Sequence, residues 1–121
     1  MGSQWGIAYD YRNQGLTWLK LNQPETALPL FEQAYAISSA IGNRINAAKA
    51  LLGLGNAQID LEQFVKAEDT FTQALDLSRS MMLQETEWRA LFGLARIRLE
   101  FHDDPDGAEG FLREAIDVIE G

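Results

Sequence analysis

The chain reads GLTWLKLNQPETALPLFEQA over residues 15–34 and GNAQIDLEQFVKAEDTFTQA over residues 55–74. Both segments begin with glycine, at Gly15 and Gly55. The distance in sequence between these two glycines is the interval at which the pattern repeats. Three further positions match at the same interval, namely Ala27 with Ala67, Phe31 with Phe71 and Ala34 with Ala74. Small and aromatic residues that recur at a fixed interval are the sequence signature of stacked structural repeats. The sequence therefore predicts a repeat protein.

A third copy of the pattern follows in a weaker form. Ala95 follows Gly55 at the same interval, so alanine replaces the glycine. The other three positions each recur one position later than this interval predicts, as Ala108, Leu112 and Ala115. The longer interval indicates one inserted residue in the third turn. Because leucine replaces the aromatic residue, the third copy departs most from the pattern.

Hydrophobic periodicity predicts an all-α fold. Phe64, Ala67, Phe71 and Ala74 follow the three-to-four-residue spacing of one face of a helix. Strand-like alternation of apolar and polar residues is missing from the sequence. Turn-forming residues divide the chain into six predicted helices, at residues 3–21, 24–40, 43–61, 64–80, 84–101 and 105–119.

Proline, glycine and aspartate mark several of the expected helix ends. Pro24 and Pro105 suit the first turn of a helix, where a missing N–H has little effect. Asp104 is a favourable N-cap before Pro105, and Gly42 suits the position after the last helical turn. Pro29 falls early in its predicted helix and would delay the start of that helix.

The repeated positions resemble the tetratricopeptide family. Its repeats carry a small residue in the first helix and Ala, an aromatic residue and Ala along the second. Here these residues are Gly15, Ala27, Phe31 and Ala34, followed by Gly55, Ala67, Phe71 and Ala74. The resemblance implies a right-handed α-solenoid of three helix-turn-helix repeats with six antiparallel helices. It also implies that these residues form the core, because small side chains let neighbouring helices pack closely.

The resemblance covers nearly the whole chain and implies one domain over residues 1–121. The repeats are expected at about residues 4–42, 43–82 and 83–120, while residues 1–3 look like a remnant of recombinant expression. The interval is longer than the usual tetratricopeptide period, and similar lengthened repeats occur in kinesin light chains and bacterial signalling proteins. Residues 87–120 also resemble the repeats that precede CHAT peptidase domains in bacteria, which implies a larger parent protein.

Composition excludes several classes of function. The net charge of -8 argues against nucleic-acid binding, which depends on clustered Lys and Arg. No apolar run approaches the length of a membrane span. Cysteine is absent, which removes disulfides and thiolate metal sites and suits the cytoplasm. We therefore expect a cytoplasmic protein whose partner is a protein or peptide.

Charge is divided unevenly between the two helices of each pair. Seven of the ten basic residues lie in the predicted first helices, whereas thirteen of the eighteen acidic residues lie elsewhere. In such stacks the first helices line a concave groove. The family's groove positions fall on Tyr9, Arg12, Asn13, Leu16, Lys20, Lys49, Leu52, Asn56, Asp60, Arg89, Phe92, Arg96 and Glu100.

The chemistry of this set predicts an extended, acidic peptide as the ligand. Arg and Lys can bind carboxylates, and the amides of Asn13 and Asn56 can bond both N–H and C=O groups of a backbone. Leu16, Leu52 and Phe92 can hold an apolar side chain. Salt screens exposed charges beyond about 8 Å, so a basic groove can function within an acidic protein. The alternative is a solvated helix face with weak ion pairs such as Glu85 with Arg89.

No catalytic, cofactor or metal site is expected. His102 is the only histidine and lacks convergent ligands, while Asp103, Asp104 and Asp106 lack the order of a calcium loop. Gly53-Leu54-Gly55 lacks the Lys and the strand of a nucleotide loop. The tryptophans are expected in packing, at Trp5, Trp18 and Trp88.

A structural spacer or self-association segment is the alternative function. Phe111, Ile116 and Ile119 make the last predicted helix apolar on a face that a capping helix would leave polar. The last helix is therefore expected to have a neighbour, which a second copy of the chain could supply in a homodimer. The ligand of the groove could equally belong to another part of the parent chain.

Overall fold

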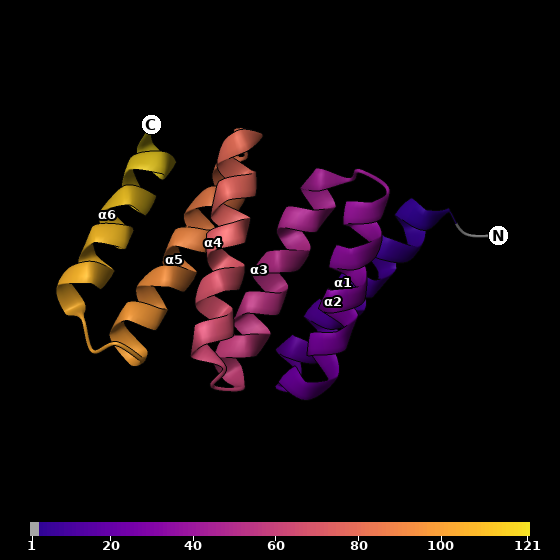
Figure 1. The fold of residues 1–121 in the computed structure, drawn as a ribbon, viewed down its shortest axis with the longest axis horizontal. Coiled ribbons are helices and arrows are strands. Elements are labelled where there is room, and N and C mark those ends of the chain that lie inside the picture. Colours follow the sequence, from indigo (N-terminus) through magenta and orange to yellow (C-terminus); the bar gives the residue numbers. More distant parts are fainter. Residues whose placement is uncertain (1–2) are drawn as a thin grey trace.

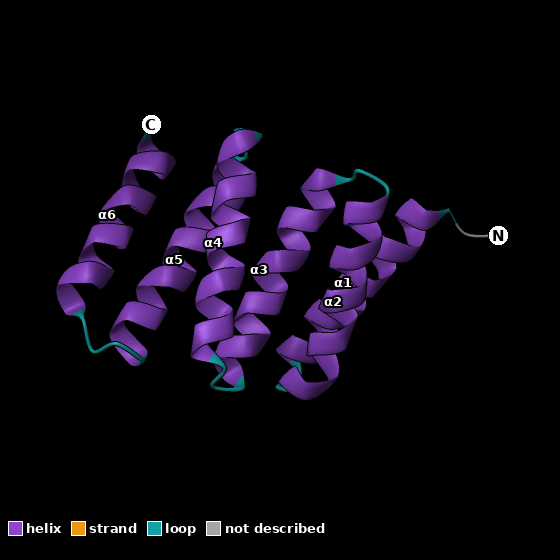
Figure 2. Cartoon of the chain, in the orientation of Figure 1, coloured by secondary structure: helices purple, strands orange, loops and turns teal. Residues whose placement is uncertain are grey.

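The computed structural model describes residues 3–121 and is all-α in that range (Figures 1 and 2). Short turns connect the helices, and neighbouring helices along the chain pack against each other. The helices are α1 (Gln4–Lys20), α2 (Pro24–Ala40), α3 (Arg44–Asp60), α4 (Phe64–Ser80), α5 (Gln84–Glu100) and α6 (Pro105–Glu120).

The helices form two layers of a right-handed solenoid. In the inner layer, α1 contacts α3 and α3 contacts α5. In the described part of the chain, the backbones of α2, α4 and α6 pack against inner helices but not against one another. The inner helices therefore lie closer together than the outer ones, which curves the stack and makes the inner surface concave. Figure 1 shows the pairs succeeding one another from the N-terminus to the C-terminus.

Two buried phenylalanine rings hold successive pairs together. Phe31 of α2 and Phe71 of α4 are 0% and 1% exposed. The Phe31 ring packs against Gly15 of its own pair and Gly53 of the next pair, where an added Cβ would overlap the ring. The Phe71 ring packs in the same way against Gly55 and Gly93. The glycines thus permit the close approach that the aromatic core requires.

The last pair ends this packing scheme. Leu112 occupies the position of Phe71 in the repeat, yet it is 37% exposed. Ile116 and Ile119 of α6 are 49% and 55% exposed. Within residues 3–121 no further helix covers this face, so a large aromatic residue at position 112 would lack the facing glycine that Phe31 and Phe71 have.

The turns after α1 to α4 share one backbone conformation. The residue after each C-cap has positive φ, with values of 61° at Asn22, 76° at Gly42, 59° at Glu62 and 57° at Met82. The next backbone N–H bonds back to the helix, as in Gln23 N to Trp18 O at 2.9 Å. This left-handed residue closes the helix by satisfying its last carbonyls. Only Gly42 avoids the steric strain that a Cβ creates there.

The turn between α5 and α6 is one residue longer than the others. It includes Asp103, with φ of 50°, and Asp104, whose Oδ1 accepts a hydrogen bond from Gly107 N at 3.0 Å. Pro105 begins α6, as the sequence indicated. The inserted residue therefore falls in this turn, where it disturbs no helix.

The structure corrects three local predictions. Ser3 and Asn43 are N-caps that precede α1 and α3, and Ser3 Oγ accepts from Gly6 N at 3.1 Å. Pro29 does not delay α2, which begins at Pro24, because Pro29 lies inside the helix. Trp5 and Trp18 are 58% and 39% exposed rather than in the core. Residues 1–2, part of the predicted expression remnant, lie outside the described range.

None of the helices in residues 3–121 has both the length and the apolar character needed to cross a membrane.

Candidate peptide-binding groove

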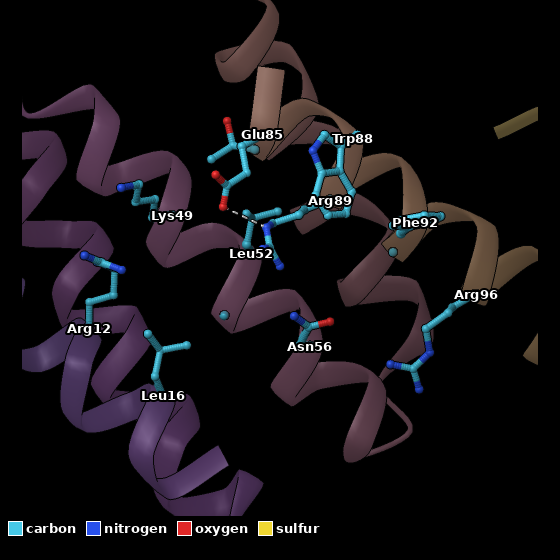
Figure 3. A pocket seen from close by; sticks show the side chains of 13 residues that line it. Arg12, Leu16, Lys49, Leu52, Asn56, Glu85, Trp88, Arg89, Phe92 and Arg96 are labelled. Atoms are coloured by element: carbon cyan, nitrogen blue, oxygen red, sulfur yellow. Dashed lines mark hydrogen bonds and ion pairs between the residues drawn. The ribbon is translucent and has the colours of Figure 1, made fainter. Parts of the chain in front are cut away.

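A groove of about 420 Å³ opens on the inner layer, between α1, α3 and α5 (Figure 3). Arg12 and Leu16 line it from α1, and Lys49, Leu52 and Asn56 line it from α3. From α5 the predicted residues Arg89, Phe92 and Arg96 complete the lining. Figure 3 shows the α1 and α5 side chains facing each other across those of α3.

Five predicted groove residues lie outside this lining, and two of them, Asp60 and Glu100, are the last residues of α3 and α5. Tyr9, Asn13 and Lys20 belong to α1, as do Arg12 and Leu16, but they do not border the cavity. No second helix faces their side of α1 in the described range, since α1 is the first helix of the stack. A cavity forms only where two inner helices flank a common space, and this requirement is invisible in the sequence of one helix.

Five residues that sequence reasoning did not assign to the groove also line it, namely Gly53, Glu85, Thr86, Trp88 and Gly93. Trp88 was predicted in packing, and it is half-buried against the core while one side borders the cavity. Helical spacing places Glu85, Trp88 and Phe92 on the same face of α5 as Arg89. Their position in the groove could therefore have been predicted from that of Arg89. The glycines could not have been assigned in this way, because their role depends on the phenylalanine rings behind them.

Arg12 is held in the groove by neutral side chains. Its Nε donates to Asn46 Oδ1 at 2.6 Å, and Asn46 Nδ2 donates to Ser38 Oγ at 2.8 Å. Its guanidinium also lies 5.2 Å from the centre of the Tyr9 ring. Burial lowers the pKa of Arg12, and the interaction with Tyr9 partly opposes this shift. Arginine nevertheless keeps its charge in proteins, so a partly desolvated cation faces the groove.

Lys49 adds a second cation on the same side of the groove. Its side chain is exposed and lines the same cavity as Arg12 (Figure 3). Across the described residues, neither Lys49 nor Arg12 has a carboxylate within ion-pair distance. This side of the groove therefore carries positive charge that the protein itself does not neutralise.

The arginines of α5 are neutralised by their own helix. Arg89 Nε lies 3.2 Å from Glu85 Oε1, and Arg96 Nε lies 2.8 Å from Glu100 Oε2. The Arg89 guanidinium also lies 4.7 Å from the centre of the Trp88 ring. Pairs of this kind are exposed and individually weak, but each places a carboxylate beside the cation. The α5 side is thus less positive than its sequence implies.

Aromatic and aliphatic side chains form the rest of the surface. Trp88 and Phe92 meet edge to face, with ring centres 5.2 Å apart. Phe92 is 39% exposed, and Leu52 is half-buried on the neighbouring α3. Asn56 of α3 also lines the cavity, and its amide can donate and accept hydrogen bonds. This side can accept an apolar side chain together with a stretch of peptide backbone.

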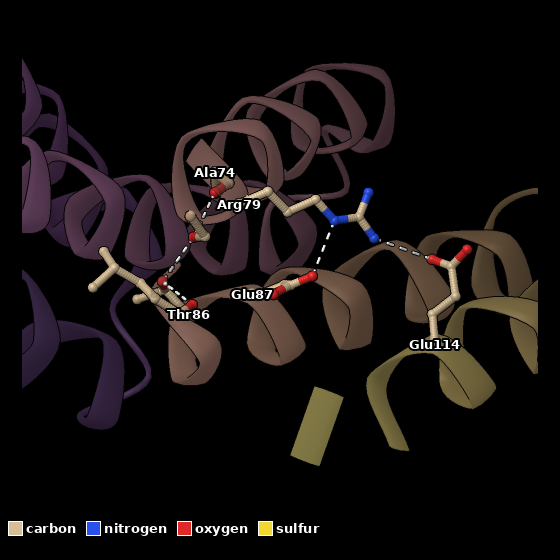
Figure 4. Close-up of polar contacts among 7 residues, drawn as sticks. Ala74, Arg79, Thr86, Glu87 and Glu114 are labelled. Carbon is tan, nitrogen blue, oxygen red and sulfur yellow. Dashed lines mark hydrogen bonds and ion pairs between the residues drawn. The ribbon is translucent and has the colours of Figure 1, made fainter. Parts of the chain in front are cut away.

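The junction between α4 and α5 is built differently from that of Ser38 and Asn46 (Figure 4). The hydroxyls of Ser78 and Thr86 are hydrogen-bonded at 2.7 Å, and Thr86 also donates to Leu83 O at 3.1 Å. Outside them, Arg79 binds Glu87 at 3.0 Å and Glu114 of α6 at 3.5 Å. Here the charged side chains tie three helices together.

His102 contacts one acidic and one aromatic side chain. Its Nε2 lies 3.2 Å from Glu68 Oε2, and its ring packs edge to face on Phe101. Among residues 3–121, no group of three His, Asp or Glu side chains is arranged to hold a metal ion.

Comparison with known proteins agrees with this architecture. A family model described as tetratricopeptide repeat matches residues 7–80. The chain therefore belongs to the tetratricopeptide repeat family. The crystal structure of the TPR domain of Arabidopsis FLU superposes with a TM-score of 0.89 at 20% sequence identity, covering 98% of each chain. No protein with a curated description matches the sequence.

The family match ends before the third pair of helices, although that pair continues the same stack. The third pair is where alanine and leucine replace the repeated glycine and aromatic residue, as Ala95 and Leu112. The fold of the third pair is thus preserved where its sequence pattern has weakened.

Proposed function

We propose that the chain is a protein–protein interaction module that binds an extended, acidic peptide segment in the groove of α1, α3 and α5. The observation that supports this proposal is the pair of cations, Arg12 and Lys49, that lack an internal carboxylate partner among the described residues. They border the same cavity as Leu52 and Phe92. An acidic peptide with an apolar side chain would complement both.

Binding would draw on three kinds of contact. Apolar side chains of the peptide would be buried against Leu52 and Phe92, and Asn56 would bond the peptide backbone. The cations would steer and orient the peptide more than they would add affinity. We expect dissociation constants on the order of micromolar, equivalent to about 8 kcal/mol, for a stack of this length.

We propose a role without catalysis or a cofactor, in the cytoplasm. The net charge of -8 disfavours nucleic acid as the partner. Residues 87–120 resemble repeats that precede CHAT peptidase domains, so the acidic segment could belong to a separate protein or to a parent chain of that kind. Both sources present the same peptide chemistry to the groove.

A peptide-display selection at physiological salt tests the proposal. The domain is compared with a triple variant, Arg12→Glu, Lys49→Glu and Arg89→Glu, after circular dichroism has shown both to be helical. We expect acidic peptides to be enriched by the unmodified domain alone, because the variant repels them. Equal enrichment by both proteins, or none by either, would contradict the proposed function.

Self-association as a spacer segment is the second candidate. It is supported by the exposed apolar face of α6, which includes Leu112, Ile116 and Ile119. Sedimentation over a range of protein concentrations tests it, with Ile116→Glu as the matched variant. A concentration-dependent dimer that Ile116→Glu dissociates would favour this candidate, whereas a monomer at every concentration would contradict it.

A further inference from the structure

The two sides of the groove differ in whether their cations are already neutralised. On the α1 side, Arg12 is fixed by Asn46, which is itself fixed by Ser38. Ser38 is fully buried and Asn46 is 6% exposed, so both anchor groups are rigidly packed. On the α5 side, Glu85 and Glu100 neutralise Arg89 and Arg96.

The fixed guanidinium is the better site for an anion. Asn46 Oδ1 uses only the Nε donor of Arg12, so the terminal nitrogens retain donors for a ligand. Its position is set before binding, so little side-chain entropy is lost when an anion arrives. The desolvation of Arg12 is not offset by any described carboxylate, and a bound anion would offset it. Arg89 and Arg96 also bond their glutamates only through Nε, but the carboxylates of Glu85 and Glu100 already offset their charge and would repel an incoming anion.

We propose that the groove binds two parts of its ligand at different places. A carboxylate binds at Arg12 and Lys49, and an apolar side chain binds at Leu52, Trp88 and Phe92. Asn46 is the positioning residue, because it holds Arg12 toward the groove without neutralising it. This inference rests on the proposed function and specifies which half of the groove gives it acidic selectivity.

The chain itself supplies a matched variant for Asn46. The repeat places Thr86 at the position of Asn46 and Ser78 at that of Ser38. Thr86 and Ser78 are hydrogen-bonded in the folded protein. Asn46→Thr should therefore keep the bond to Ser38 and the fold, while its shorter side chain cannot reach Arg12. Asn46→Asp is the complementary variant, because its carboxylate would reach Arg12 and neutralise it.

Two small probes examine the two sides separately. Sodium acetate is titrated against sodium chloride at constant ionic strength, and the Nε–H signals of the arginine side chains are followed by NMR. We expect the Arg12 signal to shift saturably with acetate, while those of Arg89 and Arg96 follow the chloride control. N-acetyl-phenylalaninamide should instead shift the indole N–H signal of Trp88.

The variants distinguish positioning from a general effect on the fold. In Asn46→Thr the apparent acetate affinity of Arg12 should fall by about tenfold, as when one hydrogen bond to a charged group is lost. In Asn46→Asp the acetate response should disappear, and in both variants Trp88 should respond to N-acetyl-phenylalaninamide as before. Equal acetate shifts at all three arginines, or an unchanged Arg12 response in both variants, would overturn the inference.

Removing the negative charge beside the α5 arginines provides the reverse test. In the double variant Glu85→Gln and Glu100→Gln, Arg89 and Arg96 should acquire the acetate response that they lack in the unmodified domain. If they remain silent, neutralisation by the glutamates is not the cause of the asymmetry and the inference fails.

Peptides separate this inference from the proposed function. If the display selection enriches no peptide while Arg12 alone responds to acetate, the peptide-binding function fails and the positional chemistry stands. If peptides are enriched but Arg12→Gln leaves their acidic positions unchanged, the positional inference alone fails. Enriched peptides with free and amidated C-termini are then compared, to show whether the carboxylate comes from a chain end or from a side chain.

Discussion

The α2–α3 and α4–α5 junctions share a packing scheme but deliver different chemistry to the groove. In each, a buried phenylalanine packs on a glycine of the following helix, Phe31 on Gly53 and Phe71 on Gly93. At the first junction the polar residues extend outward from Ser38 to Arg12. At the second, Ser78 and Thr86 bond to each other, and Leu52 occupies the repeat position of Arg12.

The comparison shows that stability and selectivity are carried by separate residues. The phenylalanines and glycines recur because every junction must bring two helices into close contact. The polar residues beside them can vary. Asn46 and Thr86 occupy equivalent positions and differ in how far their side chains reach, but this difference leaves the backbone unchanged. Groove chemistry can therefore change between repeats without a change of fold.

The largest expected effect is the loss of stability when the buried phenylalanine of either junction is removed. Phe31→Ala and Phe71→Ala should each lower the free energy of unfolding by about 3–5 kcal/mol, because each removes a fully buried ring and leaves a cavity. Urea unfolding followed by circular dichroism measures both. Phe92→Ala, a groove substitution at a partly exposed ring, is the control and should cost much less. A negligible loss at either buried ring would show that the two junctions are not equivalent.

A smaller effect should distinguish the polar parts of the two junctions. Ser38→Ala removes the partner of the buried Asn46 Nδ2 and should destabilise the protein by about 1–3 kcal/mol. Ser78→Ala should cost less, on the order of 1 kcal/mol, because Thr86 retains its bond to Leu83 O. Equal losses in urea unfolding would show that the polar residues of the two junctions contribute equally to stability.

The smallest expected effect concerns the turns that precede α3 and α5. Gly42 and Met82 both have positive φ, but only Gly42 is free of strain. Gly42→Ala should cost about 1 kcal/mol, whereas Met82→Gly should raise the unfolding free energy by roughly 0.5 kcal/mol. Thermal unfolding of the two variants measures these opposite signs. Met82 is 86% exposed, so lost packing should not obscure the result.

Much of the fold was predictable because it depends on local and repeated features. The interval between Phe31 and Phe71 revealed the repeat, and Pro24, Asp104 and Pro105 marked helix ends that the structure has. Pro29 was misjudged because α2 begins at Pro24 and continues through Pro29, which is exposed on the surface of the helix. Trp5 and Trp18 were misjudged because α1 is the first described helix and packs only against α2 and α3, which leaves these side chains 58% and 39% exposed.

The groove was less predictable from the sequence. Counting basic residues treated Arg12, Arg89 and Arg96 alike, although only Arg12 lacks a described carboxylate partner. Trp88 gave no sign of bordering a cavity, because an aromatic residue at helical spacing is typical of a core. Tyr9, Asn13 and Lys20 share a helix with Arg12 but do not border the same space.

The sequence by itself determined the all-α class, the repeat and the small and aromatic core residues, because these depend on spacing along the chain. Only the tertiary structure decided which side chains share a cavity and which cations are neutralised. Arg12 and Asn46 are 34 residues apart in sequence, yet their hydrogen bond fixes one side of the groove. Contacts between helices set such pairings, and spacing within one helix does not encode them.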